Sequence, residues 1–171
     1  ATTDEVSSLI GKAVSTNPTE IAPRLALIQY LLKNKDFKKA LSAANEAASA
    51  IPDKPEILDA LGRTQQLSGD LNQASITYGK LASLQPASPM PLLRLAEIQF
   101  NNKNPDEGTK SLKRALDIKP DLLEAQRALI QLAMDNKAPR AALDIAKIIQ
   151  KQRPKEAVGY LFEGNIHASA K

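Results

Sequence analysis

Five prolines lie 34 residues apart in this chain, at Pro18, Pro52, Pro86, Pro120 and Pro154. A fixed period of this length is typical of helical repeat proteins, in which each unit is a helix–turn–helix that stacks on its neighbours. The period therefore predicts an elongated array of helix pairs, with one apolar core that continues from unit to unit.

The apolar residues follow the same period. With each proline taken as position 32 of its unit, position 20 is mostly small and position 7 is leucine. Position 20 holds Val6, Ala40, Ala74, Gly108 and Ala142, and position 7 holds Leu27, Leu61, Leu95 and Leu129. Small residues suit places where two helices approach closely, and leucines fill the space between helices. The period is therefore a property of the packing and not of the prolines alone.

Helical spacing is clear within each unit. In the first complete unit, apolar residues recur three and four positions apart over about 21–34 and again over about 37–50. A polar turn separates the two segments, and Pro52 follows the second. Pro105 and Pro139 occur at the equivalent turns of later units. Each is predicted to be the first residue of its helix, where the missing N–H is harmless.

The pattern resembles the tetratricopeptide repeat (TPR), with leucine at position 7, a small residue at 8, alanine at 20, an aromatic at 24 and proline at 32. The second unit matches best, with Leu61, Gly62, Ala74, Tyr78 and Pro86. Position 4 lacks the usual tryptophan, and position 24 is aromatic only at Tyr78. The resemblance implies an all-α fold, a right-handed superhelical solenoid of antiparallel helix pairs.

The period divides residues 1–171 into one array that is expected to be a fragment of a longer protein. Four repeats are complete, at 21–54, 55–88, 89–122 and 123–156. Residues 1–20 supply the second helix of a preceding repeat, and 157–171 supply the first helix of a following one. Both ends are expected to expose apolar side chains and to favour end-to-end self-association. The side chains concerned are Val6, Ile10, Leu161, Phe162 and Ile166.

Catalytic chemistry has little support in the sequence. There is no cysteine, one histidine (His167) and no glycine-rich phosphate loop. His167 falls at position 11, which is usually a packing position. No apolar run approaches the ~20 residues that a membrane span requires. We therefore expect a protein that is not an enzyme, with no catalytic residue, metal site, cofactor or membrane span.

The first helix of each TPR lines the concave face, mainly through positions 2, 5, 9 and 12. This face is expected to bind a protein segment, either an amphipathic helix or an extended peptide. The predicted groove residues are Gln29, Leu32, Asp59, Arg63, Gln66, Met90, Leu93, Glu97, Phe100, Arg127, Gln131 and Met134. Phe100, Met134 and Arg127 are expected to contribute most. The alternative is that apolar members such as Leu25, Leu93 and Leu161 pack between repeats instead.

Two other partner classes are less well supported. Chaperone-binding TPRs hold an acidic C-terminal tail with a lysine at position 5, whereas this chain has Leu25, Asp59, Leu93, Arg127 and Leu161 there. Residues 103–155 contain twelve basic and seven acidic side chains, largely on the second helices. This excess could meet an anionic polymer, a membrane surface or nucleic acid, but no interleaved aromatics are present for base stacking. A solvated convex face, with no nucleic-acid partner, is the expected interpretation.

Short motifs also resemble the TPR lipoproteins of the bacterial PEP-CTERM/exosortase system. They are PRLAL at 23–27, LGR at 61–63, LLRLA at 92–96 and GYLFEGN at 159–165. The resemblance implies a periplasmic scaffold linked to exopolysaccharide production and protein sorting, lipid-anchored through a segment outside this chain. The alternatives are a cytoplasmic TPR adaptor or regulator, and the binding arm of an enzyme whose catalytic domain lies elsewhere.

Overall fold

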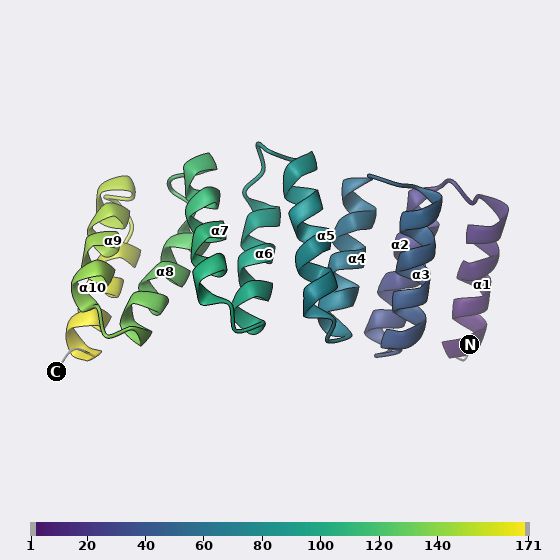
Figure 1. Cartoon of the computed structure of the whole chain (residues 1–171), viewed down its shortest axis with the longest axis horizontal. Helices are drawn as coiled ribbons and strands as arrows, with labels where there is room; N and C mark the ends of the chain where they lie inside the picture. Colours follow the sequence, from purple (N-terminus) through teal and green to yellow (C-terminus); the bar gives the residue numbers. More distant parts are fainter. Residues whose placement is uncertain (1–2, 170–171) are drawn as a thin grey trace.

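Ten α-helices form a single row in the computed structural model, which describes residues 3–169 and contains no strand among them (Figure 1). The helices are α1 (Thr3–Thr16), α2 (Ile21–Lys33), α3 (Phe37–Ala50), α4 (Pro55–Leu67), α5 (Leu71–Leu84), α6 (Met90–Asn101), α7 (Pro105–Ile118), α8 (Leu123–Asp135), α9 (Pro139–Gln152) and α10 (Val158–Ser169). The helices predicted near 21–34 and 37–50 are confirmed to within one residue, as α2 and α3.

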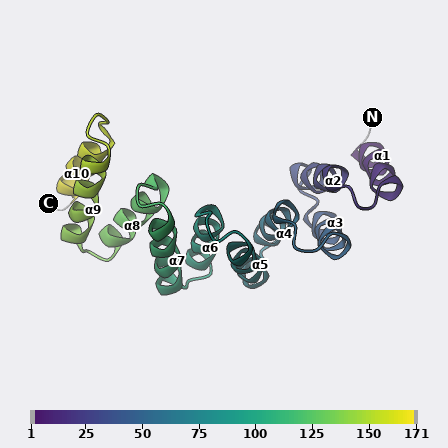
Figure 2. The ribbon, with the colours of Figure 1, turned by 90° about the horizontal axis from the view of Figure 1, so that it is seen from above.

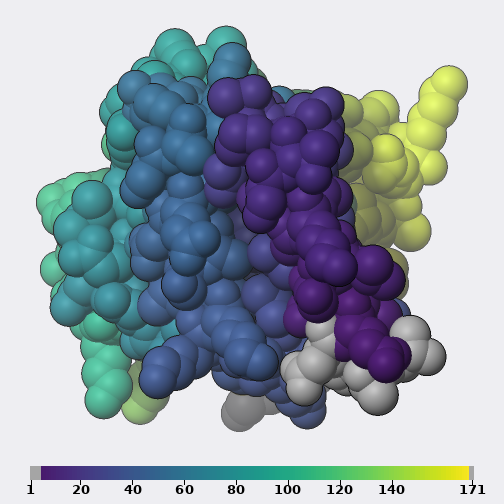
Figure 3. Space-filling view, turned by 90° about the vertical axis from the view of Figure 1, so that its right-hand side faces the viewer, coloured from purple at the N-terminus to yellow at the C-terminus, as the bar shows by residue number. Residues whose placement is uncertain are grey.

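Consecutive helices run in opposite directions and pack as pairs, α2 with α3, α4 with α5, α6 with α7 and α8 with α9. Seen from above, the row is bent, with both ends turned to the same side (Figure 2). Helices α2, α4 and α6 lie on the inner side of the bend, and α3, α5 and α7 lie on the outer side. From the N-terminal end, α1 lies at the front of the molecule with α3 beside it (Figure 3). The predicted all-α solenoid is confirmed.

The turn inside each pair contains one residue in the left-handed conformation. The residue is always at position 15, with φ of 58° at Lys35, 85° at Gly69, 59° at Lys103 and 56° at Lys137. Glycine adopts this conformation without a steric cost, so the three lysines carry local strain. Asp36 and Asp70 then cap α3 and α5 by accepting backbone N–H groups. Pro105 and Pro139 begin α7 and α9, as predicted.

Small residues face aromatic rings in two consecutive pairs, but the arrangement is reversed. In α4 and α5, Gly62 lies under the ring of the fully buried Tyr78. In α6 and α7, the ring of Phe100 on the first helix lies over Gly108 on the second. The first contact joins positions 8 and 24 of its repeat, and the second joins positions 12 and 20, so each pair of helices fills its core with a ring at a different place.

Buried hydrogen bonds join the helices of the two central pairs. Thr77 Oγ1 donates to Gln65 Oε1 at 2.7 Å, and Ser111 Oγ donates to Gln99 Oε1 at 2.7 Å. Both bonds join position 11 of the first helix to position 23 of the second. The pairing satisfies polar groups that would otherwise be buried without a partner.

The C-terminal end differs from the prediction. Ile166 is 2% exposed and packs with Ile130 and Ile149, and Phe162 packs against the same cluster. Leu161 is exposed, as predicted. His167 is exposed instead of packed, because its position normally meets the second helix of its own pair. The apolar end surface is therefore smaller than expected.

At the N-terminal end, Val6 and Ile10 are half-buried and Leu9 is the exposed apolar side chain. The prediction placed the exposed surface on Val6 and Ile10. They are partly covered because α1 packs against α2. End-to-end self-association stays a prediction, with Leu9 and Leu161 as its main apolar contributors.

Candidate functional site: the inner groove

Four cavities follow one another along the first helices of the pairs, from α4 to α10. Two lie between α4 and α6, with volumes of about 380 and 310 Å³. A third, of about 490 Å³, lies between α6 and α8, and a fourth, of about 480 Å³, lies between α8 and α10. We call this series the inner groove.

The cavity between α6 and α8 is the most apolar of the four and is called here the central cavity. Its apolar lining comes from all three helices α6, α7 and α8. The apolar residues are Met90, Leu93, Ala96, Phe100, Leu112 and Ala128. Polar atoms enter at its margin from Arg94, Glu97, Asn101 and Glu124. The chain thus offers a concave apolar surface with a few charged groups at its edge, which is the usual form of a binding pocket.

A hydrogen bond across the groove joins α4 to α6 on this face. Gln66 Nε2 of α4 donates to Glu97 Oε1 of α6 at 3.1 Å, and within α6 Arg94 Nη1 donates to Glu97 Oε2 at 3.3 Å. Glu97 is therefore already paired. Because these contacts are exposed, they position side chains more than they stabilise the fold.

Tyr78 reaches the groove from α5, with its ring in the core. Its hydroxyl donates to Asp59 Oδ1 at 3.1 Å. Burial, and then the neighbouring Asp59 carboxylate, raise the pKa of Tyr78 far above its ordinary value. The hydroxyl consequently remains a donor at any physiological pH and fixes the orientation of Asp59.

The cavity between α8 and α10 is more polar. It is lined by Arg127, Gln131 and Met134 of α8, together with Phe162 and Asn165 of α10. Gln131 donates to Asp135 Oδ1 at 2.8 Å within α8. Arg127 has no side-chain partner among residues 3–169.

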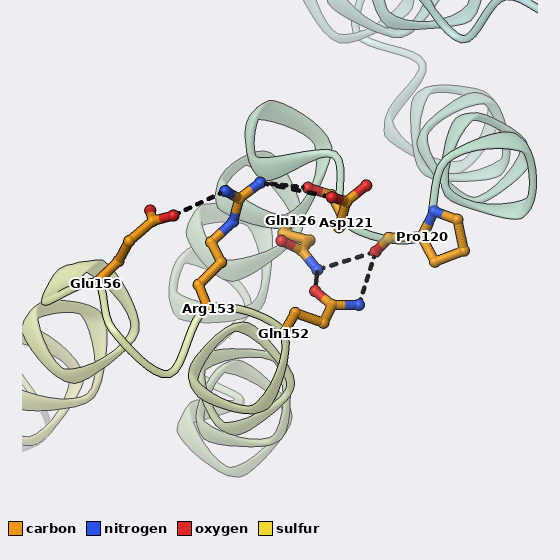
Figure 4. A network of polar contacts seen from close by, with 6 residues as sticks. All are labelled: Pro120, Asp121, Gln126, Gln152, Arg153 and Glu156. Atoms are coloured by element: carbon orange, nitrogen blue, oxygen red, sulfur yellow. Dashed lines mark hydrogen bonds and ion pairs between the residues drawn. The ribbon is translucent and has the colours of Figure 1, made fainter.

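A polar network joins the turn before α8 to the C-terminal end of α9 and the turn after it (Figure 4). The carbonyl oxygen of Pro120 accepts from Gln126 Nε2 and from Gln152 Nε2, each at 3.1 Å. Arg153 donates to the carbonyl oxygen of Asp121 at 2.8 Å, and to Glu156 at 3.3 Å. The turn before α8 is thereby joined to the turn before α10.

Ten of the predicted groove residues line these cavities. They are Asp59, Arg63, Gln66, Met90, Leu93, Glu97, Phe100, Arg127, Gln131 and Met134. Gln29 and Leu32 of α2 do not line any of the four. Gln29 is exposed on α2, and Leu32 packs against the core formed by α2, α3 and α4.

The sequence left open whether the apolar residues of this face, such as Leu25, Leu93 and Leu161, line the groove or pack between repeats. Leu25 packs against the core of the first pairs. Leu93 and Phe100 both pack against the core cluster around Leu112 and line the central cavity. Leu161 is 63% exposed and packs in neither way. Phe100 thus has two roles, since it covers Gly108 and also forms part of the cavity wall.

The lining also includes residues outside the predicted groove set, among them Arg94, Glu124 and Phe162. Arg94 lies at position 6, four residues after position 2 and three before position 9, so helical periodicity could have found it. Glu124 lies at position 2 and shares the predicted face. Phe162 could be found only from the packing of α10 on α8 and α9.

Other kinds of site have no support in residues 3–169. Within this range, no group of three or more His, Cys, Asp or Glu side chains is placed to hold a metal ion. No helix of the described part of the chain is long and apolar enough to cross a membrane.

Comparisons with known proteins agree with this architecture. A model of the tetratricopeptide-repeat family matches residues 91–122, which include α7 and all of α6 except Met90. No curated protein matches the chain by sequence.

Among solved structures, the crystal structure of MamA is 14% identical, covers 91% of each chain and gives a TM-score of 0.76. A TPR protein from Parabacteroides merdae ATCC 43184 is 14% identical with a TM-score of 0.75, over 98% of this chain and 66% of that one. YrrB, described as a TPR protein with an unusual peptide-binding site, is 16% identical with a TM-score of 0.65, over 93% and 82% of the two chains. With the 34-residue period and the row of helix pairs, these matches show that residues 91–122 match the tetratricopeptide repeat and that the chain has the fold of tetratricopeptide-repeat solenoids.

Proposed function

We propose that this chain is a non-enzymatic interaction scaffold that binds a peptide or helix of another protein in the inner groove. The observation that carries the proposal is the central cavity of about 490 Å³, whose lining is mostly apolar and partly exposed. An apolar surface of this kind between two helices suits a side chain that anchors a bound segment. Phe100, Met134 and Arg127 are the proposed main anchors.

The arrangement of the groove supports a long ligand in preference to a small molecule. The four cavities follow one another along α4, α6, α8 and α10, and neighbouring cavities share lining residues such as Met90 and Arg94. An extended peptide or a helix can occupy several such cavities at once. YrrB, which has a similar fold, is described as having a peptide-binding site.

The test uses a display library of random 12-residue peptides selected against the immobilised chain. Met90 is the residue to change, because it lines the central cavity and is 50% exposed, so its replacement should leave the fold intact. We expect Met90→Ala, which removes apolar contact area without adding a charge, to weaken binding of the selected peptides by about 1–3 kcal/mol. Phe100→Ala is less suitable, because loss of its contact with Gly108 also changes stability.

Ile148→Ala is the matched control. Ile148 is 48% exposed and lies on α9, so the change shortens an exposed apolar side chain outside the groove. Peptide binding should be unaffected by it. If the library yields no binder, or if Ile148→Ala abolishes binding while Met90→Ala does not, the groove is not the site and the proposal is wrong.

We further propose a periplasmic location and a link to exopolysaccharide production and PEP-CTERM protein sorting. This rests only on the motifs at 23–27, 61–63, 92–96 and 159–165. Sequencing the complete gene is the test. A lipoprotein signal upstream would support the proposal, whereas a flanking catalytic domain would favour the binding arm of an enzyme. A complete gene with no export signal would favour a cytoplasmic adaptor.

A further inference from the structure

We propose that the central cavity takes a lysine or arginine side chain of the bound segment, with its apolar stem against the cavity wall and its cation at Glu124. This inference rests on the proposed function, because it names the chemistry of a ligand bound in the same groove. The expected ligand of the groove is therefore a basic segment of a partner protein.

The wall of the cavity suits the stem of such a side chain. Lysine and arginine carry three or four methylene groups that readily pack along apolar surface while the charged end stays polar. Met90, Leu93 and Phe100 of α6 and Ala128 of α8 supply that surface. Arginine can also stack on an aromatic ring, and Phe100 is an aromatic ring in the lining.

The charges at the margin favour a cation over an anion. Three charged side chains line the cavity, Arg94, Glu97 and Glu124, which give a net charge of −1. Arg94 and Glu97 are paired with each other at 3.3 Å. Glu124 has no side-chain partner among residues 3–169, so its carboxylate is the group left to meet a ligand. This local sign is opposite to that of the whole chain, whose formal net charge is +4.

The neighbouring cavity between α4 and α6 extends the same preference. It shares Met90 and Arg94 with the central cavity and adds the carboxylates of Glu56 and Asp59. Asp59 already accepts the hydroxyl of Tyr78, whereas Glu56 is exposed and has no side-chain partner in the described part of the chain. A segment with a second basic residue near the one in the central cavity would therefore meet one unpaired carboxylate on α4 and one on α8.

Glu124 also has a structural explanation that the test must separate from binding. It lies in the first turn of α8, where a carboxylate stabilises the helix through the exposed N–H groups. That role predicts a change in thermal stability when Glu124 is neutralised. It does not predict any change in which peptides the groove prefers.

The experiment uses the 12-residue peptide library and the complete 171-residue chain. Peptides selected by the wild-type protein are expected to contain lysine or arginine at one common position. For the best of them, fluorescence anisotropy compares the lysine peptide with its norleucine analogue, or the arginine peptide with its citrulline analogue. Citrulline keeps the length of arginine, norleucine keeps the four-carbon stem of lysine and lacks only the terminal ammonium, and both remove the charge. We expect the wild-type protein to bind the analogue about tenfold more weakly, as for a charge-assisted hydrogen bond.

Three variants test whether Glu124 causes the difference in affinity between the basic peptide and its uncharged analogue. Glu124→Gln should remove the difference between peptide and analogue, and Glu124→Lys should shift selection towards peptides with aspartate or glutamate. Asp144→Asn is the control, since Asp144 is an exposed carboxylate on α9 that is not part of the groove. It should leave the difference unchanged. Circular dichroism of each variant checks that the helices are intact.

The outcomes distinguish this inference from the proposed function. If peptides bind in a Met90-dependent way but contain no preferred lysine or arginine, the groove binds protein segments and the basic preference is wrong. If the preference for lysine or arginine survives in Glu124→Gln, Glu124 is not its cause and the inference is wrong. If no peptide binds, or if binding does not depend on Met90, both proposals fail together.

Discussion

Replacement of Gly62 by alanine tests whether close packing, rather than helix propensity, decides the residue at position 8. A Cβ atom at Gly62 would lie 2.6 Å from Cε2 and 2.9 Å from Cδ2 of Tyr78. The ring cannot easily retreat, because Tyr78 is 1% exposed and its hydroxyl bonds to Asp59. We therefore expect Gly62→Ala to destabilise the protein.

The expected magnitude follows from two opposing effects. Alanine inside a helix is about 1 kcal/mol more favourable than glycine. Overpacking of a well-filled core costs about 1–3 kcal/mol, and the rigid ring places this site in the upper part of that range. The net expectation for Gly62→Ala is a loss of about 1–2 kcal/mol in the free energy of unfolding.

Gly79 provides the matched control. It lies on α5, next to Tyr78 in sequence, and a Cβ atom there would meet no other atom within 4 Å. Gly79→Ala should therefore show the propensity effect alone and stabilise the protein by about 0.5–1 kcal/mol. The two variants carry the same chemical change and should differ by about 1.5–3 kcal/mol.

Urea unfolding followed by far-UV circular dichroism measures both variants. The midpoint should fall for Gly62→Ala and rise for Gly79→Ala. In the background of Tyr78→Leu, which removes the ring, Gly62→Ala should become neutral or stabilising, as expected of two residues in direct contact. Equal midpoints for Gly62→Ala and Gly79→Ala would refute the packing argument, since the ring would then have moved aside without cost.

Three further changes test the turns, the buried hydrogen bonds and the helix caps. Lys103→Gly should raise the free energy of unfolding by about 0.5–1 kcal/mol, because Lys103 has a positive φ that glycine adopts freely, and a lower urea midpoint would contradict this. Thr77→Val should lower the free energy of unfolding by about 1–3 kcal/mol, because it leaves Gln65 Oε1 buried without a donor. Adding Gln65→Leu to this variant should recover most of the loss in the same assay. The backbone N–H of Lys39, which bonds to Asp36, lowers the pKa of that carboxylate below 3.8. The stability that this bond contributes is therefore present above about pH 4 and is lost as the pH falls through the lowered pKa. Asp36→Ala should remove that part of the acid dependence in melts between about pH 2 and pH 5, and an unchanged dependence would contradict the cap assignment.

The helix pairs could be predicted from the sequence because the information that specifies them is local. Proline ends a helix at a definite residue, and apolar spacing identifies the buried face within one or two turns. Each repeat contacts only its neighbours, so the same short pattern is sufficient in every repeat. For this reason α2 and α3 begin and end within one residue of their predicted bounds.

The candidate site could be predicted in part for the same reason. Positions 2, 5, 9 and 12 share one face of a helix, which correctly places Met90 and Phe100 together on α6. Phe162 could not be found in this way, because its place beside Arg127 depends on how α10 packs against α8. The pairing of Arg94 with Glu97, which leaves Glu124 as the unpaired carboxylate, likewise requires side-chain positions.

The sequence by itself therefore determined the fold class, the phase of each helix and the face that lines the inner groove. Only the tertiary structure decided how deeply each residue on that face is buried. Leu93 and Leu161 occupy the same position of their repeats, yet Leu93 is half-buried against the core while Leu161 is 63% exposed. Periodicity fixes the direction in which a side chain points along its own helix, whereas its burial depends on the neighbouring helix that covers it.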